Sequence, residues 1–185
     1  MTSTSGPTAD VSVRVAWADD ARAIAAVQVR AWPHMYGDLL PPEAIPTDVD
    51  ALAAAWREPL ARPADARQRV LVALERNLVV GFALTSPSPD PDTDSLAVGE
   101  LADLTVSPDH LGQGHGSRLL QAAVDTLSAD RFTTAVTWVN STDDRRRSFL
   151  EAAGWAPDTA HRELDLDGAG TTTVKQVRLH TDIRS

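Results

Sequence analysis

Three glycines at alternate positions are the residues whose spacing best suits chemistry. They are Gly112, Gly114 and Gly116, and they separate an apolar run from an amphipathic one. Glycine allows backbone conformations that side chains forbid and lets a ligand approach the main chain. The first N–H groups of a helix lack intrahelical partners and lie at the positive end of its dipole. The pattern therefore predicts a cradle for an anion such as a phosphate.

The spacing departs from two common phosphate-binding motifs. A Walker loop would continue with Lys and then Ser or Thr, but Ser117 and Arg118 follow the last glycine. A Rossmann fingerprint needs G-x-G-x-x-G, whereas the glycines here read G-x-G-x-G. Because such glycines also occur in purely structural turns, the interpretation depends on the flanking elements.

The elements on either side of the glycines are a predicted strand and a predicted helix. Residues 96–106 are mostly apolar and lie between a Pro/Asp/Ser-rich run and Ser107-Pro108, which is typical of a buried strand. After the glycines, apolar residues recur at the spacing of one helix face. These are Leu119, Leu120, Ala123, Val124 and Leu127.

This strand, turn and helix resemble the acyl-CoA-binding segment of the GNAT superfamily of N-acetyltransferases. The family signature is a strand, then V-x-P, then Gln/Arg-x-x-Gly-x-Gly/Ala at the start of a helix. Val-Ser-Pro at 106–108 and Leu-Gly-Gln-Gly-His-Gly at 111–116 occupy those places. Leu111 replaces the usual Gln or Arg, which removes one pyrophosphate contact and leaves the backbone cradle.

The resemblance implies acetyl-CoA as the acyl donor and no metal. The turn would hold the pyrophosphate, and backbone N–H groups of the strand would bind the pantetheine arm. The residues implied for the cofactor are Leu104, Val106, Leu111, Gly112, Gln113, Gly114, His115, Gly116, Ser117 and Asp143.

A second stretch, residues 143–155, is also similar to the family. Phe149, Glu151, Gly154 and Trp155 match the family pattern. Asp143 replaces an asparagine that often touches the pantetheine arm, and Leu150 replaces a tyrosine that often serves as general acid. The resemblance therefore implies a cofactor site without the usual acid.

A general base is expected because an amine acceptor is mostly protonated at pH 7. Two carboxylates of the predicted central strand qualify, Glu100 and Asp103, and alternation places them on opposite faces. The position of Glu100 is similar to that at which several GNAT enzymes carry their general base. His34 and His110 are rival bases, and either carboxylate could instead be an ion-pair partner of an arginine.

Residues 31–45 are rich in aromatics and prolines and predict a loop over the sheet, following a helix that ends before Pro33. The resemblance implies that Trp32 and Tyr36 in this segment line the acceptor pocket. The other interpretation is that both simply cover the core.

The remaining periodicities predict the order β-α-α-β-β-β-α-β-α-β-β, which is also the GNAT order. We therefore expect an α/β (α+β) fold with a mixed, central, splayed β-sheet flanked by helices. Asp19 or Asp20 is predicted to cap the first helix, and Thr47 the second, which would stop at Pro59. The Asp- and Pro-rich run 85–95 fails the calcium-loop pattern and is expected to be a solvated, flexible loop.

Length and composition set limits on the class of protein. The 185 residues suit a single domain over 11–185, with 1–10 as a disordered tail. The net charge of −9 argues against nonspecific nucleic-acid binding and favours a neutral or cationic small partner. The absence of cysteine excludes disulfides and thiolate chemistry. Without a signal peptide or a membrane-spanning run, a cytoplasmic location and no membrane partner are expected.

Two function classes stay open. The first is an enzyme that transfers an acetyl group from acetyl-CoA to a primary amine of a small molecule or peptide. The second is a noncatalytic CoA-binding regulatory or antitoxin-type protein on the same fold, which the departures at Leu111, Asp143 and Leu150 favour. A G-x-S-x-G hydrolase elbow and clustered zinc ligands are both missing from the sequence. The sequence leaves open whether the chain pairs as a homodimer.

Overall fold

A computed structural model describes residues 10–184, and its elements follow the expected order. The strands are β1 (Val11–Val15), β2 (Arg69–Glu75), β3 (Leu78–Pro87), β4 (Val98–Val106), β5 (Thr134–Asn140), β6 (Ala156–Asp165) and β7 (Thr173–Asp182). The helices are α1 (Ala21–Tyr36), α2 (Val49–Ala61), α3 (His115–Ala129) and α4 (Asp144–Ala152). The expected tail lies outside the described residues except for Asp10, whose carbonyl accepts a hydrogen bond from the N–H of Arg76.

The strands form one mixed sheet in the order β1-β2-β3-β4-β5-β7-β6. Neighbouring strands are antiparallel except β4 and β5, which are parallel and joined through α3. A parallel pair needs such a crossover, usually a helix. The prediction of a mixed sheet flanked by helices is confirmed.

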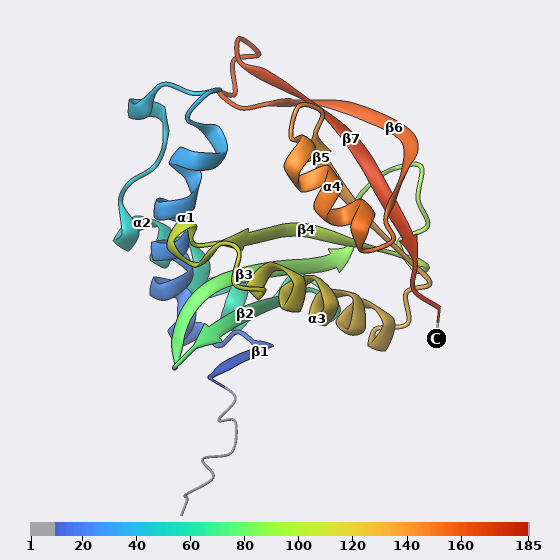
Figure 1. Cartoon of the computed structure of the whole chain (residues 1–185), viewed down its shortest axis with the longest axis horizontal. Coiled ribbons are helices and arrows are strands. Elements are labelled where there is room, and N and C mark those ends of the chain that lie inside the picture. The colour runs from blue at the N-terminus through green and yellow to red at the C-terminus, as the bar shows by residue number, and fades with distance from the viewer. Residues whose placement is uncertain (1–9, 185) are drawn as a thin grey trace, which may run out of the picture.

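Helices cover both faces of the sheet (Figure 1). On one face, α3 and α4 pack over β2–β5 and β7 around a core that includes Leu101, Leu119 and Leu150. On the other face, α1 and α2 pack over β2 and β3 around Ile24 and Phe82. The helices α1 and α2 therefore cover only part of their face, and the half of that face formed by β5, β7 and β6 carries polar side chains.

The first helix runs through Pro33 and ends at Tyr36, so the predicted loop at 31–36 is wrong. Proline removes one backbone donor inside a helix, which usually breaks it. The turn continues because Ala31 is packed in the core and the N–H of Gly37 bonds to the carbonyl of Pro33. Trp32 and Tyr36 therefore lie on a helix.

The predicted helix caps also differ from those observed. Asp20 does not cap α1, because its carboxylate binds the N–H of Trp17 and the guanidinium of Arg14. Asp48, not Thr47, caps α2 by accepting two backbone N–H bonds. The helix α2 then continues past Pro59 to Ala61.

The Asp- and Pro-rich connection between β3 and β4 is held by side chains, contrary to the expected flexible loop. Asp90 and Asp92 both accept hydrogen bonds from Arg178 of β7, at 3.0 and 2.7 Å. Asp158 of β6 accepts a third bond from the same guanidinium at 2.7 Å. Because Arg178 and Asp90 are both nearly buried, this cluster fixes the connection against the far half of the sheet.

Candidate active site

The strands β4 and β5 separate in the middle of the sheet. Residues 98–100 of β4 pair with β5, and the pairing stops after Glu100, which lies opposite Val136. Beyond that point, the carbonyl of Leu101 accepts the hydroxyl of Thr137 at 2.8 Å. The carbonyl of Leu104 accepts a hydrogen bond from Nη1 of Arg146, a residue of α4, at 2.8 Å. The second half of β4 therefore has one edge without a neighbouring strand, as the expected splay requires.

Two N–H groups of β4 face this open edge. The N–H of Ser107 bonds to Val80 on β3, and hydrogen-bonding groups alternate along a strand. The N–H groups of Leu104 and Val106 consequently point away from β3. The bond from Arg146 to the carbonyl of Leu104 agrees, because the N–H and C=O of one strand residue point the same way.

The glycine turn adopts the conformation that its residue types predict. Gly112 and Gly114 have φ of 74° and 83°, in the left-handed region that side chains rarely adopt, and α3 begins immediately afterwards. The guanidinium of Arg118 folds back over the turn, and its Nη1 donates to the carbonyl of Gln113 at 3.1 Å. Oriented amides and one cation thus surround the turn. The sequence reasoning missed Arg118, although it lies one helical turn after Gly114.

The other predicted residues of the turn differ in what they offer a ligand. Leu111 is 46% exposed. The side chain of His115 is buried and its Nε2 lies 3.1 Å from a carboxylate oxygen of Glu75, so this side chain is not available to a ligand. Gly116 lies beside Phe149 of α4.

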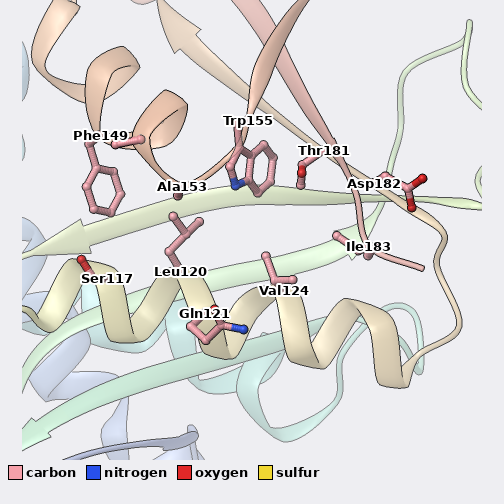
Figure 2. Close-up of a pocket in the computed structure, with 11 residues that line it drawn as sticks. Ser117, Leu120, Gln121, Val124, Phe149, Ala153, Trp155, Thr181, Asp182 and Ile183 are labelled. Atoms are coloured by element: carbon pink, nitrogen blue, oxygen red, sulfur yellow. The ribbon is translucent and has the colours of Figure 1, made fainter. Parts of the chain in front are cut away.

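A groove of about 450 Å³ runs between α3 and α4, and it begins at the glycine turn. Figure 2 shows Ser117, Leu120 and Val124 of α3 on one side and Phe149 and Trp155 on the other. Ser117 and Phe149 lie at the end nearest the turn. This end of the groove therefore approaches the glycine turn, where Gly116 lies beside both Phe149 and Val106 of β4.

Glu100 is buried where β4 and β5 separate. Burial raises the pKa of its carboxyl, and the negative charge of Asp90 raises it further. The guanidinium of Arg162 opposes both effects. A carboxylate in such surroundings binds a proton more readily than a free glutamate does. This property suits a general base, which must accept a proton.

Asp103 faces the same side of the sheet as Glu100, so the prediction of opposite faces is wrong. The strand β4 has a bulge between the pairs Leu84↔Asp103 and Thr85↔Leu101. Leu101 and Leu104 both join the core under α3, so Glu100 and Asp103, which precede them, face away from α3. A bulge inserts one residue and interrupts the alternation on which the prediction relied.

Tyr36, at the end of α1, reaches the same region. Burial raises the pKa of its phenol, the charge of Asp103 adds to this effect, and that of Arg146 opposes it. Burial likewise raises the pKa of Asp103, whose carboxylate accepts the hydroxyl of Thr105 at 2.7 Å. Trp32 lies one helical turn before Tyr36. The charges of Asp103 and Arg146 thus both act on Tyr36.

The two rival histidines lie in other surroundings. His34 is exposed, and its Nδ1 is 3.3 Å from the carbonyl of Arg30 in α1. His110 follows the end of β4 and lies near Glu75, whereas Glu100 is in the first half of that strand. Within residues 10–184, no group of three His, Asp or Glu side chains is arranged to bind a metal ion. No helix of this part of the chain has the length and apolar character needed to cross a bilayer.

Comparisons with known proteins identify the family. The sequence profile described as "Acetyltransferase (GNAT) family" matches residues 15–155, well over half of the chain. The chain belongs to the GNAT family of acetyltransferases. A comparison with curated protein sequences gives no match.

Solved structures share the fold of this GNAT chain at low sequence identity. One is yncA, a putative acetyltransferase from Salmonella typhimurium with acetyl-CoA, at 17% identity, 95% coverage of both chains and a TM-score of 0.68. Another is the paiA N-acetyltransferase from Thermoplasma acidophilum with coenzyme A, at 14% identity and a TM-score of 0.70, covering 93% of this chain and 98% of that one. An N-acetyltransferase from Staphylococcus aureus has 17% identity and a TM-score of 0.68, with coverages of 94% and 99%.

The two departures in the second GNAT segment have structural roles here. The carboxylate of Asp143 caps α4 by accepting the N–H of Arg146 at 2.9 Å. Leu150 is 1% exposed and packs in the core under α3 and α4. The side chain at position 150 therefore faces the core of this GNAT domain.

The sequence reasoning missed the polar face formed by β5, β7 and β6. Trp138 of β5, Arg162 of β6 and Arg178 of β7 lie there beside Asp90. These residues come from segments up to 88 positions apart. No local motif links them, because strand register alone brings them together.

Proposed function

We propose that the protein is an N-acetyltransferase that transfers an acetyl group from acetyl-CoA to a primary amine of a small molecule or peptide within a ternary complex. The observation that carries this proposal is the open edge of β4 ending at a left-handed glycine turn, with a cation folded over that turn. Backbone N–H groups in such an arrangement suit the amides of a pantetheine arm and the phosphates that follow it.

Each part of the donor has a complementary part of the chain. The N–H groups of residues 113–117 and the guanidinium of Arg118 suit the pyrophosphate. The N–H groups of Leu104 and Val106 suit the pantetheine arm, with Arg146 moving off the carbonyl of Leu104 if the arm takes that acceptor as well. Positioning both reactants in one cleft supplies much of the rate acceleration in such transfers.

Glu100 is proposed as the general base. The amine nitrogen loses a proton to its carboxylate, directly or through water, and attacks the thioester carbonyl carbon. The new C–N bond forms, the nitrogen of the tetrahedral adduct gives up its second proton to solvent, and the adduct collapses as the C–S bond breaks and the sulfur leaves as a thiolate. Because a thiol has a pKa of about 8.5, the thiolate can leave near neutral pH without a dedicated acid. The buried Leu150 therefore does not prevent catalysis.

Thermal melting with and without acetyl-CoA tests the binding half of the proposal. At a hundredfold excess over its dissociation constant, the donor should add about 2.7 kcal/mol of stability. Gly114→Val should abolish this shift, because a side chain at φ +83° distorts the cradle. Gly168→Val is the matched control: Gly168 has φ +69° in the β6–β7 turn, so its variant should melt lower and keep the shift.

Release of free thiol with a panel of primary amines tests the catalytic half. A binding shift accompanied by amine-dependent thiol release supports the enzyme. A binding shift without release by any amine would favour the noncatalytic CoA-binding alternative. If millimolar acetyl-CoA does not move the melting curve, both proposals fail.

A further inference from the structure

Arg162 of β6 is held in one orientation on the polar face of the sheet. Its guanidinium carbon lies 4.2 Å from the ring centroid of Trp138, and its Nε donates to Oε1 of Gln176 at 2.9 Å. Nε2 of Gln176 in turn donates to Oδ1 of Asn140 at 3.0 Å. A side chain that stacks on an indole and is oriented by a fixed amide has lost much of its rotational freedom before any ligand arrives.

The far end of this guanidinium has no hydrogen-bond partner among residues 10–184. The nearest carboxylate oxygen, on Asp90, is 3.9 Å from Nη1 of Arg162. The other oxygen of Asp90 already binds Nη1 of Arg178 and the indole N–H of Trp138, each at 3.0 Å. The side chain of Arg162 is 38% exposed. Its two Nη groups are therefore open to a ligand that enters from solvent.

Strand register places Arg162 on the same face as Glu100, because Glu100 pairs with Val136 and Arg162 stacks on Trp138, two residues further along β5. The other charged groups of this face are Asp90, Asp92 and Asp158, and all three bind Arg178. Arg178 is thus shared by three carboxylates, whereas Arg162 has only the 3.9 Å contact with Asp90 and lies on the same face as the buried Glu100. This pair is complementary to a molecule that carries a carboxylate near an amine.

We propose that Arg162 binds a carboxylate of the acceptor, so that the acceptor is an amino acid whose amine is directed to Glu100. A guanidinium and a carboxylate form two parallel N–H···O bonds, which fixes the orientation of the ligand as well as its affinity. This inference rests on the proposed function and leaves its reaction unchanged. It names the substrate class that the acceptor side is built to hold.

Matched substrate pairs test this inference. Each pair is a common α-amino acid and the primary amine that differs from it only by loss of the carboxylate, with β-alanine and 4-aminobutyrate added to vary the spacing between the groups. For the preferred amino acid, kcat/KM should exceed that of its decarboxylated partner by about tenfold or more. Equal or better use of the decarboxylated amines by the wild type would overturn the proposal.

Arg162→Gln then separates recognition from general damage. KM for the amino acid should rise about tenfold or more relative to KM for the decarboxylated amine, and the comparison is made within each pair because loss of this charge also raises the pKa of Glu100. Arg162→Lys should recover part of the loss, because it keeps the charge and loses the planar fork. Equal losses for both members of a pair would contradict the assignment, since they would indicate a structural role.

Lys175→Gln is the control variant. This variant removes one positive charge from the β6–β7 hairpin. Lys175 comes directly before Gln176, the partner of Arg162, so its side chain lies on the opposite face of the sheet, as do Val177 and Leu179. It should leave the discrimination between paired substrates unchanged.

Calorimetric titration of the amino acids into the protein with bound CoA measures their binding without any acetyl transfer. Carboxylate-dependent binding that Arg162→Gln removes supports the proposal even if catalysis is slow. If acetyl-CoA binds and amines are acetylated but no carboxylate dependence appears, the inference fails and the proposed function stands. If acetyl-CoA does not bind, the proposed function itself has failed.

Discussion

Burial and one neighbouring negative charge give Glu100 its proposed role. Its carboxyl is buried at the point where β4 leaves β5, and both the burial and Asp90 raise its pKa. Asp103 also has a raised pKa, but its carboxylate accepts a hydrogen bond from Thr105 and lies near Arg146. Of the two carboxylates, Glu100 is the one without a hydrogen bond from its own strand among the described residues.

Glu100→Gln should lower kcat by about 10² to 10⁴ at pH 7, because an amide cannot take the proton from the amine. The affinity for acetyl-CoA, measured by the melting shift, should be nearly unchanged. Asp103→Asn is the matched control and should cost much less. No loss in Glu100→Gln would mean that the acceptor arrives neutral or that water removes the proton.

The same residue should shape the pH profile of kcat/KM. Only the ionised carboxylate accepts a proton, so activity should fall as the pH drops through the pKa of Glu100. Since that pKa is raised, the fall should occur above the usual range for glutamate. The inflection should disappear from the residual activity of Glu100→Gln.

Tyr36 is the single tyrosine of the sequence and lies near the cleft at the end of α1. If the thiolate leaves unaided, Tyr36→Phe should reduce kcat by less than about tenfold, since a general acid is typically worth 10² or more. Steady-state kinetics with saturating donor measure this. A hundredfold loss with intact acetyl-CoA binding would instead identify Tyr36 as the acid.

At the scale of elements, Arg178 joins three segments that the chain order keeps apart. Its guanidinium binds the β3–β4 connection through Asp90 and Asp92, and the start of β6 through Asp158. These bonds raise the pKa of Arg178 and lower that of Asp92. The cluster thereby holds Asp90 next to Glu100.

Arg178→Met should destabilise the fold by about 3 kcal/mol, because it leaves the nearly buried carboxylate of Asp90 without its cation. Urea unfolding measures the change. Arg184→Met is the control: Arg184 pairs with Asp182 on the surface, where both side chains are more than half exposed. That variant should stay within about 0.5 kcal/mol of the wild type. Similar effects of the two variants would show that the Arg178 cluster contributes no more than a surface pair.

At the scale of the whole molecule, the sheet is continuous up to Glu100 and divided beyond it. The α1 and α2 layer covers one half, while α3 and α4 lie together on the other face and border the groove (Figure 1). A donor in the proposed site would contact β4, the glycine turn and both of these helices. Binding should therefore stabilise the divided region more than the continuous one.

Hydrogen exchange with and without acetyl-CoA measures this difference. Amides of Leu104, Val106 and residues 112–117 should exchange more slowly when the donor is bound, because they gain partners at the open edge and the turn. Amides of β1 and β2, on the far side of the sheet, should change little. Uniform protection of the whole chain would indicate only global stabilisation and would contradict the proposed contacts.

Local rules account for what the sequence by itself determined. The order of elements and the glycine turn were both predicted and are both present. Each depends on neighbours in the chain: apolar periodicity, the positive φ that glycine tolerates, and the unpaired N–H groups at a helix start. The family resemblance rests on the same short stretch and could therefore be seen without a structure.

Only the tertiary structure decided the acceptor side. A bulge turned Asp103 to the face of Glu100, packing carried α1 through Pro33, and register brought Arg162 beside Trp138 and Gln176. Side-chain contacts between distant strands depend on register, and a shift of one residue moves every side chain to the other face. The sequence carries no local signal for such a shift, so the residues that would select the acceptor emerge only when the strands are paired.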